Sequence, residues 1–398
     1  MVRHFSKYLP DLSLYLTCEF FMTNKPLSID TPINTADDNS EIMITASRQQ
    51  QLNSWLQQVF ELPFTLTSLP GDASARRYHR LHLVDENAGT DGRYMVMDSA
   101  DEQDAMQQFI KVTKIMTPAI NVPKLIAQDI EQGFLVLQDF GSVEFADLLP
   151  EATHEQVNKH YQLAMQTLIA LQCLDTDIVK SDYQLPDYDT VLLNCEMDLF
   201  RDWFVPYIEV SLDLTLWDNL KVALIKEVLA QPQVVVHRDY HSRNLMQDQA
   251  DNARLGVIDF QDAVIGAYSY DLVSLVRDAY VEWPETQVSQ WIYDYWQLQK
   301  QADLPTAASA KQFEHDVNIM GVQRQLKVLG IFIRLFQRDG KSRYLANIPK
   351  VLDDLMFELE WLETQGSAEL IVAIKPFNQW LIETVLPTFQ SKFVQQYI

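Results

Sequence analysis

Cysteine is scarce in this chain, and the few cysteines present follow no recognisable pattern. Cys18, Cys173 and Cys195 are the only three in 398 residues. Their spacing is typical neither of a metal site nor of a disulfide framework. A sparse, odd-numbered set fits a reducing compartment, so we expect a cytoplasmic protein.

Positive charge and long apolar runs are also lacking. The chain has 31 lysines and arginines against 55 aspartates and glutamates, which gives a formal net charge of −24. Nucleic acids and anionic membranes attract basic surfaces, so we expect neither as a partner, and the acidic surface keeps the protein soluble. No stretch reaches the roughly 18 uninterrupted apolar residues of a membrane span, and we find no internal repeat.

The first 45 residues differ from the rest. An apolar segment after a basic start suggests a signal peptide, but Asp11 and Glu19 interrupt it and no small-residue cleavage site follows. Residues 23–45 are polar and rich in turn formers. We therefore expect residues 1–45 to be a disordered or non-native tail, with Met22 and Met43 as alternative starts.

Residues 234–262 carry the clearest chemical pattern. The apolar runs 234–236 and 255–258 are typical of short buried strands, and polar residues follow each run. These are His237, Asp239 and Asn244 after the first run, and Asp259 after the second.

Phosphoryl transfer from a nucleotide requires a carboxylate that orients and deprotonates a hydroxyl, and oxygen ligands for Mg²⁺. The kinase pattern H-R-D-L-x-x-x-N places Asp and Asn five residues apart, before a strand that ends in Asp-Phe-Gly. Asp239 and Asn244 keep that spacing, and Asp259 begins Asp-Phe-Gln at the corresponding point. The pattern predicts a kinase-like phosphotransferase; the alternative is that Asp239 and Asn244 only cap a turn.

The preceding segment, 46–140, has the pattern of a small sheet domain. Helical spacing over 46–60 gives way to alternation of period two, interrupted by turn residues and one amphipathic helix at 101–116. The strand-like runs are 64–69, 76–84, 93–99, 122–130 and 133–140. We expect about five antiparallel strands with one crossing helix, and a hinge near Asp139–Gly141.

The remainder, 141–398, is predominantly helical in pattern. Thr153 and Gln156 form a capping box before a helix that reaches about Leu174. Further helices are expected at 188–210, 218–230, 269–282, 286–302, 311–337, 350–365 and 376–397. Together the two parts predict an α+β, protein-kinase-like two-lobed fold, with a small antiparallel-sheet N-lobe that binds ATP and a large, mostly helical C-lobe.

Several segments resemble a known family. HRDYHSRNLM followed by GVIDFQDAVIGAYSYDLVSLVRDAY resembles the aminoglycoside phosphotransferase-like small-molecule kinases. GDASARRYHRL, RYMVMDS and QLKVLGIFIRLFQRDGKSRYL are more similar to the anomeric N-acetylmuramate/N-acetylglucosamine kinases of bacterial cell-wall recycling. The likeness covers about residues 47–398. It implies ATP, Mg²⁺ and transfer of the γ-phosphoryl group to the anomeric hydroxyl of an amino sugar, whose product would feed UDP-sugar synthesis.

The resemblance also implies roles for single residues. Asp239 matches the catalytic base, and Asn244 and Asp259 match the metal ligands. His237 and His241 are expected to brace the loop. Asp271 either accepts hydrogen bonds from the catalytic-loop backbone or caps its own helix. In such a fold the hinge backbone, here Gln138 to Phe140, offers hydrogen bonds to adenine.

The N-lobe departs from the kinase pattern at one strand. A kinase carries a phosphate-binding lysine there, whereas 93–99 has Met95 and Met97. Either the protein is an inactive relative, or another cation takes over. Guanidinium groups bind phosphate in a bidentate way, so we expect Arg76 or Arg77, with Ser74 and the turn before them, to bind ATP. The alternative is two solvated strand arginines.

The substrate is less well defined by the sequence. Arg243 beside the metal ligands would repel a polycationic aminoglycoside and suit a substrate with a carboxylate, such as N-acetylmuramate. Arg243 could instead pair, as a structural brace, with another nearby acid or with Asp262, which is the other candidate substrate residue. Arg324, Lys327 and Arg334 either line the cleft or lie on a solvated helix face. Aromatic residues either stack on a sugar or pack in the core; these are Trp203, Phe204, Tyr268 and Trp283.

Three functions therefore remain open from the sequence. The first is an amino-sugar kinase, the second an aminoglycoside- or choline-type kinase, and the third a nucleotide-binding pseudokinase. Each would bind small molecules, and we expect a monomer.

Overall fold

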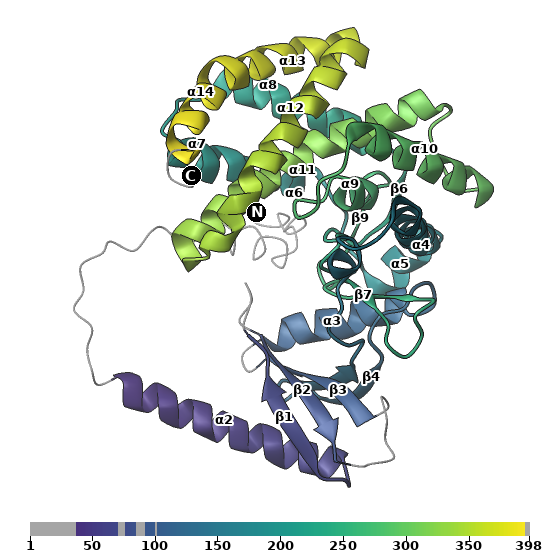
Figure 1. Cartoon of the computed structure of the whole chain (residues 1–398), viewed down its shortest axis with the longest axis vertical. Helices are drawn as coiled ribbons and strands as arrows, with labels where there is room; N and C mark the ends of the chain where they lie inside the picture. Colours follow the sequence, from purple (N-terminus) through teal and green to yellow (C-terminus); the bar gives the residue numbers. More distant parts are fainter. Residues whose placement is uncertain (1–36, 71–75, 85–91, 100–101, 395–398) are drawn as a thin grey trace, which may run out of the picture.

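The computed structural model describes residues 37–70, 76–84, 92–99 and 102–394. It has two lobes, a small one built on a sheet and a large helical one (Figure 1). Most of the expected tail, including Cys18, lies outside the described residues. The first helix, α2 (Asp37–Val59), begins nine residues earlier than the predicted residue 46, so the boundary expected at residue 45 falls within this helix.

The N-lobe sheet has five antiparallel strands in the order β1-β2-β3-β5-β4, which confirms the predicted sheet. Four of the five predicted strand runs are trimmed by only one or two residues at their ends, and β4 begins three residues late. The strands are β1 (Phe64–Ser68), β2 (Arg77–Leu83), β3 (Arg93–Asp98), β4 (Leu125–Asp129) and β5 (Phe134–Gln138).

Helices cover both faces of this sheet. Phe134 and Val136 of β5 belong to the apolar cluster formed with α2. Leu135 and Leu137 belong to the main core, together with α3 (Gln103–Met116). Because successive strand residues point to opposite faces, a strand covered on both sides becomes apolar throughout, as β5 is. In Figure 1, α3 lies between the sheet and the large lobe, and α2 lies on the far side.

The C-lobe is built mostly from helices around the 30-residue helix α11 (Ala310–Asp339). Helix α4 (His154–Gln172) begins with the predicted capping box, in which Thr153 and Gln156 each bond the other's backbone amide. The other helices of four or more residues are α5 (Thr176–Tyr183), α6 (Thr190–Leu199), α8 (Leu214–Ala230), α9 (Tyr270–Val276), α10 (Glu285–Gln301), α12 (Ile348–Gln365), α13 (Ala368–Trp380) and α14 (Leu386–Phe389).

Short 3₁₀ and π helices, together with one three-residue α-helix, complete the lobe. They are η2 (Phe145–Leu148), η3 (Phe200–Phe204), α7 (Val205–Tyr207), η4 (Ser342–Asn347), η5 (Leu381–Val385) and η6 (Gln390–Val394). Thus the predicted helix 188–210 is α6, η3 and α7 in succession, and the predicted helix 269–282 ends early, at Val276. Helix α5 was not predicted.

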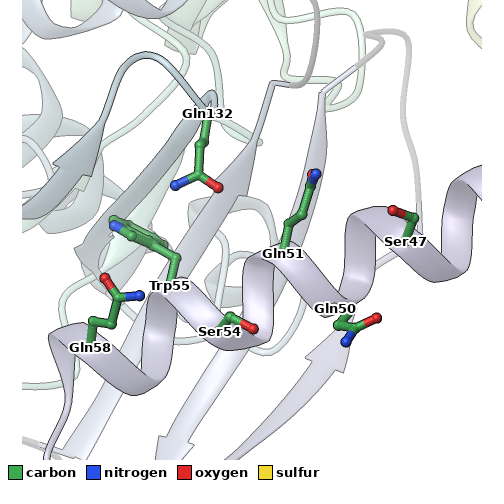
Figure 2. Close-up of a pocket in the computed structure, with 7 residues that line it drawn as sticks. All are labelled: Ser47, Gln50, Gln51, Ser54, Trp55, Gln58 and Gln132. Atoms are coloured by element: carbon green, nitrogen blue, oxygen red, sulfur yellow. The ribbon is translucent and has the colours of Figure 1, made fainter.

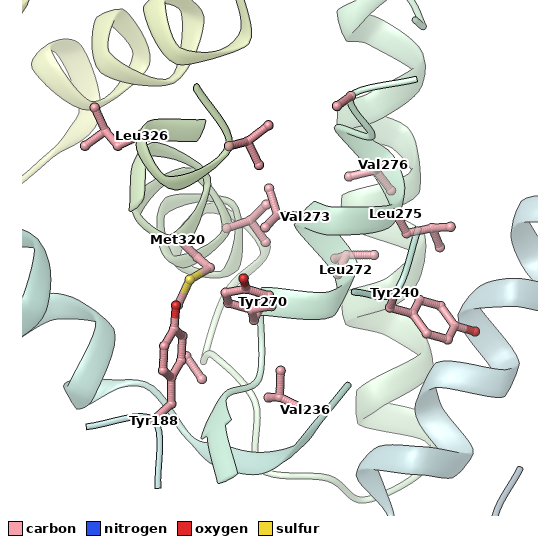
Figure 3. Close-up of a cluster of buried hydrophobic side chains, with 14 of the residues drawn as sticks. Tyr188, Val236, Tyr240, Tyr270, Leu272, Val273, Leu275, Val276, Met320 and Leu326 are labelled. Carbon is pink, nitrogen blue, oxygen red and sulfur yellow. The ribbon is translucent and has the colours of Figure 1, made fainter. Parts of the chain in front are cut away.

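Two small antiparallel sheets of two strands each carry the predicted catalytic residues in the helical lobe. Strand β6 (Gln233–Val236) pairs with β9 (Val264–Ala267), and β7 (Leu245–Gln247) pairs with β8 (Leu255–Val257). Figure 3 shows the buried side chains where β6, α9 and α11 meet, among them Val236, Tyr270 and Met320. The buried core therefore supports these small sheets and holds the loops at their ends in place.

No helix in the described part of the chain is both long and apolar enough to cross a membrane.

Candidate active site

The two site-bearing loops leave their strands with unusual backbone geometry. Arg238, two residues after β6, has φ of +75°, and Asp259, two residues after β8, has φ of +63°. Non-glycine residues rarely adopt these angles, and such strain is concentrated at functional sites. Here it turns Asp239 and Asp259 out of the directions that an extended strand would give them.

The three residues that match the kinase pattern lie together. The Nδ2 atom of Asn244 donates to the backbone carbonyl of Asp239 at 2.9 Å and lies 3.5 Å from Oδ2 of Asp259. The other carboxylate oxygen of Asp259 accepts from Nε2 of Gln261 at 2.9 Å. Spacing in the sequence and proximity in space therefore agree for this triad.

His237 and Asp271 hold the catalytic loop in place through hydrogen bonds. The carboxylate of Asp271 accepts from the backbone amides of His237 at 2.7 Å and Arg238 at 3.0 Å, which is the contact predicted for it. The buried ring of His237 lies with Nε2 3.0 Å from the carbonyl of Ile258, while Nδ1 accepts from the amide of Asp239 at 3.2 Å. One neutral ring thus ties both site-bearing loops together.

The pKa values of these supports follow from burial. Desolvation raises the pKa of Asp271 to about 7, against the opposing effect of the two amide donors. Desolvation also lowers the pKa of His237 to about 4, so the ring is neutral near pH 7. A neutral imidazole provides the one donor and one acceptor that its two contacts require.

His241 lies beside Asn244. Its Nε2 atom is 3.4 Å from Nδ2 of Asn244, and its ring packs edge-on against Tyr280 with centroids 5.4 Å apart. The next residue, Ser242, donates its amide to Asp278 at 2.8 Å. This geometry fits the bracing role expected for His241.

A buried ion network surrounds Asp239, and the sequence did not reveal it. Glu196 of α6 accepts from Arg238 and lies 3.0 Å from Nζ of Lys327 on α11. Lys327 also donates to the hydroxyl of Tyr270 at 3.0 Å. These two cations hold the pKa of Glu196 at about 2, although burial alone would raise it.

The same charges act on the catalytic aspartate. Burial raises the pKa of Asp239, but Lys327, His241 and Arg238 outweigh it, so the pKa lies below its usual value. Asp239 is therefore ionised at neutral pH. The pKa of Asp259 is raised instead, first by burial and then by the charge of Asp239.

The sequence left open whether the three cations of α11 line the cleft or lie on a solvated helix face, and the structure excludes the second alternative. Arg324, Lys327 and Arg334 are each at least 90% buried, so none lies on a solvated helix face. Arg324 donates to the hydroxyl of Ser274 at 2.7 Å. Lys327 contacts Glu196 and acts on Asp239, and Arg324 is close enough to His241 and Asp271 to influence their pKa values.

Asn244 and Asp259 fit a magnesium ion. Both offer oxygen atoms, and Mg²⁺ commonly takes one or two protein ligands and completes its shell with water and phosphate. No group of three or more His, Cys, Asp or Glu able to hold a metal occurs among the residues that the structure describes. The site is thus suited to a metal that arrives with a nucleotide.

The two N-lobe arginines have different surroundings. Arg76 lies 3.5 Å from Glu102, which precedes α3, and also bonds the Tyr78 hydroxyl. Tyr78 is close enough to Asp259 for that carboxylate to raise its pKa, after the larger effect of burial. Arg77 is exposed and is paired in register with Asp98. Ser74 lies outside the described residues.

The hinge is braced by an arginine that the sequence did not single out. Arg80 of β2 forms a bidentate pair with Asp139, at 2.7 and 3.2 Å, and donates to the carbonyl of Gly141 at 2.8 Å. The carbonyl of Phe140 already accepts from the amide of Gln249 at 3.2 Å. The Phe140 ring is buried, and the amide of Gln138 already donates to the carbonyl of Lys124 at 2.9 Å, so neither group is available to a ligand.

Helix α3 connects the sheet to the metal-binding loop. The ring of Phe109 stacks on that of Phe260 with centroids 4.9 Å apart, and Gln108 lies 3.4 Å from the carbonyl of Gln261. A shift of α3 would therefore move the loop that carries Asp259.

The predicted substrate residues are placed as follows. Arg243 pairs with an acid, as one alternative predicted, but the acid is Glu144 at 3.6 Å and not Asp262; an isolated bridge to Met246 brings Glu144 alongside. Asp262 is exposed, and its carbonyl accepts from Arg238 at 3.2 Å. The four aromatic candidates belong to the hydrophobic core or pack against it, and none is exposed: Trp203, Phe204, Tyr268 and Trp283.

A separate hollow of about 290 Å³ lies on α2, lined by polar side chains such as Gln51, Ser54 and Gln132 (Figure 2). It lies on the face of the sheet opposite α3, so it is distinct from the triad of Asp239, Asn244 and Asp259.

Comparison with known proteins gives consistent matches. A sequence profile described as the phosphotransferase enzyme family matches residues 65–309. An N-acetylmuramate/N-acetylglucosamine kinase of Pseudomonas putida is 38% identical over 76% of this chain and 89% of its own length. One of Neisseria meningitidis is 39% identical over 77% of this chain and 90% of its own.

Solved structures agree on the fold. An ADP-bound aminoglycoside phosphotransferase, APH(2'')-Ib, matches with a TM-score of 0.52 and 13% identity over 78% of this chain and 97% of its own. A choline kinase from Streptococcus pneumoniae also gives a TM-score of 0.52, at 12% identity over 77% and 98%. Identities this low indicate a common fold and say nothing of substrate.

Proposed function

Because the chain belongs to the phosphotransferase enzyme family, we propose that it is an ATP- and Mg²⁺-dependent kinase that phosphorylates the anomeric hydroxyl of N-acetylmuramate, N-acetylglucosamine or both. The observation that carries the proposal is the convergence of Asp239, Asn244 and Asp259. The substrate class is supported by relatives with that name at 38% and 39% identity.

Asp239 is the base in this proposal. Its carboxylate is ionised and half-buried, and it stands on a loop fixed by Asp271 and His237. It orients the sugar hydroxyl and accepts its proton, while the oxygen attacks the γ-phosphorus and the bond to the departing ADP breaks. Its fixed position contributes by alignment as well as by proton transfer.

Asn244 and Asp259 hold the metal in this proposal. The bound ion would neutralise charge on the nucleotide phosphates. Asn244 contributes an oxygen without adding negative charge, and Gln261 fixes one carboxylate oxygen of Asp259. The magnesium charge will also oppose the raised pKa of Asp259 and keep it ionised.

On the N-lobe side, Arg76 takes the place of the absent lysine. The kinase pair joins a strand lysine to a glutamate of the neighbouring helix. Here Arg76 and Glu102 join the start of β2 to the start of α3 in the same way, next to Tyr78 and Asp259. This pairing favours an active enzyme over a pseudokinase. A cytoplasmic place in cell-wall sugar recycling would follow from the substrate.

A coupled assay of ADP release tests the function. The full chain should consume ATP with N-acetylmuramate or N-acetylglucosamine, and not with kanamycin or choline. Asp239→Asn should lower kcat by about 10² to 10⁴-fold, the range of general-base catalysis. The control is Asp251→Asn, an exposed residue in the turn between β7 and β8, which should leave kcat unchanged.

If the chain phosphorylates only kanamycin or choline, the assignment of an amino sugar as the substrate is wrong. Full activity of Asp239→Asn would remove the base assignment.

A further inference from the structure

Two arginines lie on one aromatic surface beside the catalytic loop. The guanidinium of Arg243 lies over the ring of Tyr280, 4.9 Å from its centroid, and that of Arg343 lies over Tyr344 at 5.0 Å. The ring of Phe332 connects the two tyrosines, with centroids 6.2 Å and 5.2 Å away. We call these five residues the arginine platform.

The two guanidinium groups are close enough to interact. The pKa of Arg243 is lowered by burial and by the charge of Arg343, and raised by Tyr280, Glu144 and Tyr344, with a net upward shift. Two cations on one surface attract an anion, and each guanidinium offers a planar fork of donors that matches a carboxylate.

The platform adjoins the reaction centre. Arg243 directly precedes Asn244 in the chain, and the ring of Tyr280 lies 5.4 Å from that of His241. His241 in turn lies 3.4 Å from the amide of Asn244. A single imidazole therefore separates the platform from the metal-binding amide.

Other cations near Asp239 are engaged in the protein interior. Arg238 and Lys327 share Glu196, with side chains only 10% exposed, and Arg324 is bonded to Ser274. Arg243 differs, because its side chain is 33% exposed and its contact with Glu144 is 3.6 Å long. Arg343 is exposed as well, and its Nη2 atom donates to the hydroxyl of Tyr344 at 3.1 Å. Within the described residues, the platform is thus a cationic surface on the C-lobe side of the triad that an incoming ligand can reach.

We propose that the arginine platform binds the carboxylate of the lactyl ether of N-acetylmuramate. The inference rests on the proposed function and deepens it, since it names the residues that separate the two candidate sugars. N-acetylglucosamine carries a neutral hydroxyl where N-acetylmuramate carries this acid. A phosphate of the nucleotide is the other anion that could reach these arginines, and the experiment distinguishes the two.

The test uses the full chain with Arg343→Ala and measures kcat and KM for both sugars and for ATP. Losing one charge-assisted contact costs about 1.5–3 kcal/mol, so kcat/KM for N-acetylmuramate should fall roughly 10- to 100-fold, mainly through KM. Values for N-acetylglucosamine and ATP should stay within about twofold. Arg343→Lys should recover part of the loss, because it keeps the charge and loses the fork.

The control is Arg338→Ala, which removes an exposed arginine of α11 that is paired with its neighbour Asp339. This variant should leave kcat and KM unchanged for both sugars. Retained activity on N-acetylglucosamine shows that Arg343→Ala is folded.

Equal losses on both sugars, or a loss confined to ATP, would overturn the carboxylate assignment and leave the proposed function standing. If the parent enzyme phosphorylates neither sugar, the proposed function fails and this inference fails with it.

Discussion

Arg76 and Arg77 are neighbours in the sequence, yet they lie in different environments. Strand alternation sends them to opposite faces of the sheet. Arg76 meets Glu102 and Tyr78, on the face that approaches Asp259. Arg77 is exposed on the other face. The sequence proposed either residue for phosphate binding, and the geometry favours Arg76.

Arg76→Ala should therefore raise the KM for ATP or lower kcat, by roughly 10- to 100-fold in kcat/KM, because a charge-assisted phosphate contact is lost. Arg77→Ala is the matched control and should stay within about twofold. Steady-state kinetics with varied ATP measures both. Equal effects of the two substitutions would contradict the assignment.

Local spacing identified some residues and could not identify others. Asp239 and Asn244 lie on one loop of fixed length, so a short pattern specifies their relation. Arg238 and Glu196 are 42 positions apart, and a contact across that separation depends on how α6 packs. Lys327 also meets Glu196 only through the packing of α11, so its role is not visible in the sequence.

At the scale of elements, the hinge is fixed to the sheet. Arg80 reaches from β2 to Asp139 and to the carbonyl of Gly141. Gly141 has φ of +104°, which suits glycine. This clamp sets the direction in which the chain leaves β5 and enters the C-lobe.

Arg80→Ala should raise the KM for ATP by about tenfold, because the hinge backbone loses its bidentate brace. The matched control is Arg48→Ala, which breaks a comparable pair between α2 and Asp98 on the other face of the sheet. That variant should lower the melting temperature and leave the KM for ATP unchanged. An unaltered KM in Arg80→Ala would mean that the hinge is held by other contacts.

Element types were predictable wherever a strong local signal was present. The strand alternation and the capping box of α4 both gave elements that the structure contains. Ends set by packing were not predictable: α9 stops at Val276, where the chain turns to place Arg277 against Glu285 and Glu358. The two-lobed fold followed from the order of elements alone.

At the scale of the whole molecule, the free energy of unfolding depends on two buried carboxylates whose pKa values are shifted in opposite directions. Glu196 has a pKa near 2 in the folded chain, against an ordinary value of 4.5. Its stabilising contribution is complete above pH 4.5 and is lost as the pH falls toward 2. Glu358 is also fully buried, but its pKa is raised, first by desolvation, so its contribution has the opposite sign.

Chemical denaturation at pH 6 and pH 3.5 should show this difference. Between these values the parent should lose about 1 kcal/mol more stability than Glu196→Gln, because the variant has no carboxylate to protonate there. Glu358→Gln should lose more stability than the parent over the same interval. Parallel losses in all three proteins would show that neither carboxylate governs acid unfolding.

The network of Glu196, Arg238 and Lys327 has a consequence for how the enzyme is made. Helix α11 leaves the ribosome long after the catalytic loop, since it follows α9 and α10 in the chain. The loop lacks its lysine anchor until that helix has docked. A nascent or truncated chain that stops before α11 would carry every residue of the recognisable motif and would still lack the lysine that contacts Glu196 and lowers the pKa of Asp239.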